Sequence, residues 1–147
     1  MNTPVRTLLR RKGTSVITTA PDATVYASIE TMVAHNVGAI VVVDDGTPIG
    51  VFTERDYLRR IVLRGRTSQT TRVREVMTTD LVTAAPDTTV QECLSLMTQV
   101  RCRHLPVLVD GRLAGIVSIG DCVKHLLGAA EAEVASLQDY VLGRYPR

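Results

Sequence analysis

Aromatic residues and cysteines are both scarce in this sequence. Only 3% of the 147 residues are aromatic and tryptophan is absent, so the core has to be built from aliphatic side chains and methionine. The three cysteines, Cys93, Cys102 and Cys122, contain no Cys-x-x-Cys pair and cannot all pair with one another within one chain. Because reduced thiols are typical of the cytosol, we expect free thiols and a cytoplasmic location.

Long apolar runs and a strong charge of either sign are also missing. No run approaches the roughly 20 apolar residues that a membrane helix needs, and no apolar stretch of a secretory signal follows the N-terminal basic residues. These residues, Arg6, Arg10, Arg11 and Lys12, are interpreted as the solvated face of a helix. The 17 basic and 15 acidic residues leave a net charge of +2, which is too even a balance to attract nucleic acid. We therefore expect neither a membrane nor a nucleic-acid partner, and any anion site has to be local.

An internal repeat organises the chain. The segment TSVITTAPDATV at residues 14–25 recurs 65 residues later as TDLVTAAPDTTV at residues 79–90. Without any gap, 13 of the 43 positions between residues 14 and 56 are identical to their counterparts. The pairs include Asp45-Gly46 with Asp110-Gly111, Gly50 with Gly115, and Asp56 with Asp121. Two copies of one structural unit are predicted.

Each copy predicts the order β-α-β-β-α, so the fold class is α/β of the α+β type, with the two units in pseudo-twofold tandem. In the first copy Val25, Ile29, Met32 and Val33 have helical spacing, and Asp45-Gly46 separates two apolar strands. The predicted strands are residues 16–18, 39–43 and 49–52, then 105–109 and 113–117; the closing helices carry Tyr57, Leu58, Ile61 and Val62 in the first copy and residues 122–127 in the second. Unit 1 then spans residues 5–63, a polar linker residues 64–72, unit 2 residues 73–127, and a last amphipathic helix residues 128–147.

Both units end their last strand in the same pattern: glycine, two apolar residues, a hydroxyl residue, two spacers and aspartate. The hydroxyl and the carboxylate are Thr53 and Asp56 in unit 1 and Ser118 and Asp121 in unit 2. This spacing is typical of a capping box, which satisfies free N–H groups at a helix start. A helix start is also a natural place for a phosphate, and an aspartate one turn inside it can accept both hydroxyls of a ribose. The two interpretations are compatible.

The paired units resemble a tandem of CBS domains, also called a Bateman module. The resemblance covers roughly residues 5–127 and is carried by VITTAPDATV, GAIVVVDDGTPIGVFTERD, VTAAPDTTV and HLPVLVDGRLAGIVSIGD. The segments FTERDY and SIGDCVKHLL are further similar to small stand-alone CBS-pair proteins. The resemblance implies a homodimer that binds an adenosyl ligand (AMP, ADP, ATP, NAD, NADH or, less favoured, S-adenosylmethionine) between its units. Since no effector domain is attached, the signal would act in trans on an unidentified protein.

The resemblance also implies roles for particular residues. Acceptors of ribose hydroxyls would be Asp56 and Asp121, with hydroxyl donors from Thr53 and Ser118. The mouths of the clefts would be formed by Thr18, Ala20, Thr83 and Ala85, and the apolar wall beside the adenine by Ile40 and Leu105.

The segment before the second strand differs between the copies. Residues 100–104 contain Arg101, Arg103 and His104, whereas unit 1 has Gly38 and Ala39 at the positions of the last two. Because a guanidinium can hold two phosphate oxygens at once, the three basic residues are candidates for phosphate contacts, and the two clefts are predicted to differ in affinity or ligand. In unit 1, Arg55 is a further candidate, with a solvated surface position as the alternative.

Other functions have less support in the sequence. We find no nucleophile with a base and an orienting group and no glycine-rich phosphate loop of the Walker type, so no enzyme and no catalytic cofactor is predicted. His35, His104 and His125 lack metal-ligand spacing, so no metal site is expected. A structural module, or one that contacts protein or nucleic acid without a nucleotide, remains the alternative.

Overall fold

The computed structural model describes residues 3–12 and 16–128. The first unit consists of α1 (Val5–Lys12), β1 (Thr18–Thr19), α2 (Val25–Ala34), β2 (Ala39–Asp44), β3 (Thr47–Thr53), α3 (Glu54–Asp56) and η1 (Tyr57–Val62). The second consists of η2 (Val73–Glu75), α4 (Val90–Val100), β4 (His104–Val109), β5 (Arg112–Ser118) and a helix at residues 119–128. The predicted α/β fold is confirmed, and residues 129–147 of the predicted last helix lie outside the described residues.

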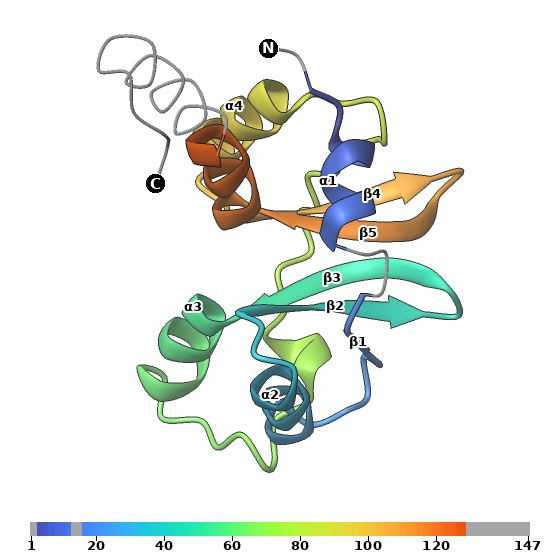
Figure 1. The fold of residues 1–147 in the computed structure, drawn as a ribbon. Helices are drawn as coiled ribbons and strands as arrows, with labels where there is room; N and C mark the ends of the chain where they lie inside the picture. Colours follow the sequence, from blue (N-terminus) through green and yellow to red (C-terminus); the bar gives the residue numbers. More distant parts are fainter. Residues whose placement is uncertain (1–2, 13–15, 129–147) are drawn as a thin grey trace, which may run out of the picture.

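Two β-hairpins form the middle of the molecule. In the first sheet β1 runs parallel to β2, and β2 pairs with β3 in antiparallel register. In the second sheet β4 pairs with β5, and Ala84 makes a single parallel bridge to Val107 where β1 stands in unit 1. Figure 1 shows the hairpins stacked with β3 beside β5 and with α2 and α4 on the two outer sides. Residues at the carboxyl ends of β3 and β5 therefore lie where the two units meet.

The hairpin turns use the same two residues in both units. Asp45 and Gly46 have φ values of 51° and 80°, and Asp110 and Gly111 have values of 52° and 76°. Two successive positive φ values define the type I′ turn, which matches the twist of a hairpin. The Asp-Gly pair in the sequence therefore marks the turn that the backbone adopts.

The core of each unit contains residues from the segment that begins the other unit in sequence. The first core contains Val25, Met32, Ile40 and Phe52 and also Val73 and Val76, which follow the linker. The second core contains Val90, Met97, Leu105 and Val117 and also Val5, Leu8 and Leu9 of α1. In space, α1 thus belongs to the second unit although it begins the first one in sequence, and the two units are tied together in both directions.

The closing helix of the first unit departs from the predicted α-helical spacing. Residues Tyr57–Val62 form a π-helix, whose hydrogen bonds span five residues, as from the N–H of Leu63 to the carbonyl of Leu58. The wider turn rotates the apolar positions, so that Ile61 is buried whereas the Leu58 and Val62 side chains are exposed. The helix predicted from the spacing of these residues is present, but its turns are wider than those of an α-helix.

Candidate functional site

The capping boxes predicted at both strand-to-helix junctions are present. The N–H of Thr53 donates to Asp56 Oδ2 at 3.0 Å, and the N–H of Asp56 donates to Thr53 Oγ1 at 3.1 Å. Ser118 and Asp121 repeat this pair of hydrogen bonds at 2.9 and 3.0 Å. Each aspartate is therefore held in a fixed orientation at the end of its strand.

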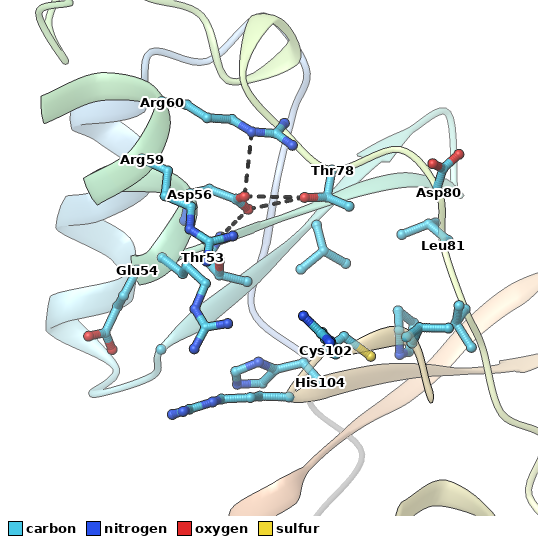
Figure 2. A pocket seen from close by; sticks show the side chains of 18 residues that line it. Thr53, Glu54, Asp56, Arg59, Arg60, Thr78, Asp80, Leu81, Cys102 and His104 are labelled. Carbon is cyan, nitrogen blue, oxygen red and sulfur yellow. Dashed lines mark hydrogen bonds and ion pairs between the residues drawn. The ribbon is translucent and has the colours of Figure 1, made fainter. Parts of the chain in front are cut away.

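A second partner holds the Asp56 carboxylate on its other side. Thr78, from the segment after η2, donates its hydroxyl to Asp56 Oδ1 at 3.2 Å and exchanges two backbone hydrogen bonds with Val51. Arg60 Nε lies 3.8 Å from Asp56 Oδ1, and the same guanidinium donates to the carbonyls of Val76 and Met77. Figure 2 shows Thr53, Thr78 and Arg60 converging on this carboxylate. Asp56 is only 7% exposed. Because Arg60 belongs to the first unit and Thr78 to the second, both units set the position of this carboxylate.

A cavity of about 630 Å³ lies beside Asp56. This volume falls in the range of small-molecule sites. One wall comes from unit 1 through Thr53, Arg55 and Asp56, and the opposite wall comes from unit 2 through the end of α4 and the start of β4. Of the residues proposed from sequence, those that line the cavity are Gly38, Thr53, Arg55, Asp56, Arg101, Arg103 and His104.

The cavity walls carry an excess of positive charge. Five arginines, Arg55, Arg59, Arg60, Arg101 and Arg103, line it together with the three carboxylates of Glu54, Asp56 and Asp80. Because a guanidinium binds phosphate or carboxylate oxygens through paired hydrogen bonds, such walls favour an anionic ligand.

Two further titratable side chains face this cavity. Burial, followed by the positive charge of Lys12, lowers the pKa of His104, and the negative charge of Asp121 offsets this only in part. His104 is therefore largely neutral at pH 7. Burial also raises the pKa of the Cys102 thiol, despite opposing backbone hydrogen bonds. Neither side chain adds a charge to the cavity at neutral pH.

Several residues predicted for the site lie elsewhere. The side chains of Ile40 and Leu105 are 0% exposed and belong to the two cores, so they do not form the apolar wall of this cavity. That wall is made instead by Val51, Leu81, Val82, Val100 and Pro106. The other predicted residues that do not line this cavity are Thr18, Ala20, Ala39, Thr83, Ala85, Ser118 and Asp121.

Other residues of the site were missed from sequence. Arg59 and Arg60 follow Asp56 by three and four residues, a spacing that places side chains on one side of a helix, and this signal could have identified them. Thr78 lies 22 residues from Asp56, and nothing in its local sequence indicates the contact.

The second carboxylate, Asp121, has a different environment. Lys12 Nζ lies 2.6 Å from Asp121 Oδ2 and 3.0 Å from the carbonyl oxygen of Ile116. Burial raises the pKa of Asp121, but the hydrogen bonds from Lys12 and Ser118 and the charge of Lys12 outweigh it, so the pKa lies below its usual value. Asp121 lines a separate hollow between α1 and the helix at residues 119–128.

Two other features are absent from residues 3–12 and 16–128. Within these ranges no three or more histidine, cysteine or acidic side chains are grouped as metal ligands would be. The same part of the chain contains no helix long and apolar enough to cross a membrane.

Comparison with known proteins identifies similar chains. Residues 2–63 and 73–128 each match the family model for the CBS domain. The CBS domain-containing protein CBSX3, mitochondrial, of Arabidopsis thaliana is 39% identical over 98% of this chain and 74% of that protein. The crystal structure of the CBS-domain containing protein ATU1752 from Agrobacterium tumefaciens is 43% identical, with a TM-score of 0.80 over 84% of this chain and 98% of that one.

A more distant structure contains bound ligands. The CBS domain pair of protein MJ0100, in complex with 5′-methylthioadenosine and S-adenosyl-L-methionine, is 23% identical to this chain. The TM-score is 0.74 over 84% of this chain and 99% of that one. The two proteins share the fold.

Proposed function

This chain belongs to the CBS-domain family, whose paired domains are in general regulatory ligand-binding modules, and we propose that it is a non-enzymatic sensor of an adenine nucleotide. The ligand binds in the cavity beside Asp56. One observation carries the proposal: a single cavity joins the Asp56 carboxylate of unit 1 to Arg101 and Arg103 of unit 2. A carboxylate accepts hydrogen bonds from ribose hydroxyls, and guanidinium groups bind phosphate.

The charge of the cavity favours AMP, ADP, ATP, NAD or NADH over S-adenosylmethionine. The MJ0100 domain pair holds S-adenosylmethionine, which carries a positive sulfonium. In this chain, Arg101 and Arg103 are added to the three arginines of unit 1. A phosphate is attracted to such walls, whereas a sulfonium is repelled.

Binding at this place can act as a signal because both units contribute to the cavity. A ligand that touches both walls favours the arrangement of the units in which both sets of contacts form. The size of that effect is limited by the difference in affinity between arrangements. The output then passes to a separate protein, which reads the arrangement of the module.

We propose that the module forms a homodimer through its two closing helices. Leu58 and Val62 on η1 and their repeat counterparts Val123 and Leu127 are all exposed apolar side chains. Figure 1 places the two helices on the same side of the molecule. A pseudo-symmetric apolar face of this kind suits a second copy of the chain, since twofold dimers bury the same surface on both partners.

Isothermal titration with AMP, ADP, ATP, NAD, NADH and S-adenosylmethionine tests the sensor function. Asp56→Asn removes the charge but keeps an oxygen for the N–H of Thr53, so the cap survives. Because hydrogen bonds to a charged group contribute about 1.5–3 kcal/mol, we expect a roughly 10- to 100-fold loss of affinity. Asp44→Asn, at an exposed position on β2, is the matched control and should bind as the wild type does.

The same titration decides between the sensor and its alternative. Arg101→Met should weaken the phosphate-bearing ligands and leave S-adenosylmethionine unaffected or bound more tightly, since a repelling charge is lost. Absence of binding by all six compounds at millimolar concentration would favour the structural or protein- or nucleic-acid-interaction module.

A further inference from the structure

The two repeat-related carboxylates are held by different partners. In unit 1, Thr78 donates its N–H to the Val51 carbonyl and its hydroxyl to Asp56. In the second unit, the equivalent acceptors are the Ile116 carbonyl and Asp121, and the single ammonium of Lys12 donates to both. Lys12 therefore makes both contacts with one charged group at hydrogen-bond distance, whereas Arg60, the charged neighbour of Asp56, keeps its Nε 3.8 Å from Oδ1.

The equivalence follows from how the preceding segments pack. A Cβ atom on Gly50 would meet the Met77 side chain, and one on Gly115 would meet the Leu9 side chain. Each segment thus crosses its hairpin at the same repeat position, and each continues toward the aspartate of that unit. The segment after Met77 brings a threonine to this place, whereas the segment after Leu9 brings a lysine.

The chemical difference matters for a ribose. A threonine hydroxyl is neutral and can rotate to another acceptor, so a ribose hydroxyl competes with it on equal terms. The Lys12 ammonium lies 2.6 Å from Asp121 Oδ2, and a charge-assisted hydrogen bond of this kind is roughly twice as strong as a neutral one. A ribose would have to displace this ion pair and also the bond to Ile116.

The wall that faces phosphate in the first cavity has no cationic counterpart in the repeat. The positions equivalent to Arg101, Arg103 and His104 are occupied by Asn36, Gly38 and Ala39. Lys124 and His125 do stand at the positions of Arg59 and Arg60, but they share a helix with Asp121. Besides Lys12, the hollow at Asp121 is lined by Arg11 of α1 and by Lys124 and His125 of the closing helix. A nucleotide there would lack the pair of arginines that faces Asp56 across the first cavity from the opposite unit.

We propose that Lys12 closes the second ribose position of the module, so that each chain binds one nucleotide, in the cavity beside Asp56. This proposal rests on the sensor function proposed above. It makes Lys12 the residue that determines how many ligands the module accepts. The basic residues of α1 are then not all equivalent, because Lys12 blocks a site whereas Arg10 at the same helix end remains solvated.

The number of ATP molecules bound per chain, measured by isothermal titration, tests the proposal. Wild type and Arg10→Met, the matched control on α1, should each bind one ATP, and Asp56→Asn should bind none in the same concentration range. Lys12→Met should bind a second ATP at Asp121. The dissociation constant for this second ATP should be at least tenfold lower than for any second ATP that the wild type binds. Lys12→Gln, which keeps a polar side chain, serves as a second variant if Lys12→Met does not fold.

The double variant Lys12→Met with Asp56→Asn separates this proposal from the sensor function. One ATP bound by the double variant places the new site at Asp121 and supports the closure by Lys12. Two ATP molecules bound by the wild type, or one bound by both Lys12 variants, would overturn the closure and leave the sensor function standing. Binding by the Lys12 variants but not by the wild type would support the closure and refute the site at Asp56. No ATP bound by any variant, together with no binding of the other five compounds, would refute both.

Discussion

Gly50→Ala is predicted to damage both the stability of the fold and the site. A Cβ atom at this position would lie 2.5 Å from Met77 Sδ and 3.1 Å from the backbone carbonyl oxygen of Thr78. The methionine side chain can move, but the backbone of Thr78 is held by two hydrogen bonds to Val51. The crossing segment therefore has to shift, and the Thr78 hydroxyl moves with it away from Asp56.

The magnitude follows from the cost of overpacking. An extra carbon in a packed region costs about 1–3 kcal/mol, and for a chain of this length each kcal/mol lowers Tm by roughly 2–4 °C. We expect a fall in Tm of about 2–12 °C by thermal unfolding, and weaker nucleotide binding because the partner of Asp56 is displaced.

Two other glycines provide the scale for this measurement. A Cβ on Gly115 would meet only the side chain of Leu9, at 2.7 Å, and one on Gly120 would lie 3.5 Å from Ser118 Oγ, an ordinary contact. The predicted order of destabilisation is Gly50→Ala, then Gly115→Ala, then Gly120→Ala, the last with no loss because alanine favours a helix. A Gly50→Ala protein as stable as the Gly120→Ala protein would refute the close crossing at Gly50.

Three further predictions concern pH, thiol reactivity and assembly. Because the lowered pKa of His104 means that the unfolded chain takes up its proton at a higher pH than the folded chain, stability should fall as the pH drops from 7.5 to 5.5. Urea titrations should show a smaller fall for His104→Gln. A thiol reagent should modify Cys102 first, since burial raises the pKa of the other two thiols to about 11, and bound nucleotide should slow this reaction; equal rates for all three thiols would contradict it. If the proposed dimer forms through the closing helices, Leu58→Asp with Leu127→Asp should convert it to a monomer in light scattering, whereas an unchanged mass would exclude that face.

The features that the sequence predicts well are local. The Asp-Gly turns and both capping boxes involve residues no more than three positions apart, so their hydrogen bonds depend mainly on the neighbouring residues. The 65-residue repeat then predicts that whatever forms in one unit forms in the other. For this reason the amino-acid pattern alone singles out Thr53, Asp56 and their counterparts.

The residues that form the walls of the site are predicted less well from the sequence. A run of consecutive apolar residues, such as 39–43 or 105–109, does not say which side chains enter a core and which face a cavity. Ile40 and Leu105 lie in the two cores and not in the wall of this cavity. Arg101 and Arg103 could be named as candidates for phosphate contacts from their residue type, yet their position opposite Asp56 depends on how the two units stack.

The sequence by itself determined the two units, their turns, their helix caps and the pair of aspartates that follow the last strands. Only the tertiary structure decided that α1 packs in the second unit, that Thr78 reaches Asp56, and that Lys12 reaches Asp121. The physical reason is the separation along the chain. Contacts across three residues follow from local geometry, whereas Lys12 and Asp121, 109 positions apart in the chain, are brought together only when both cores are packed.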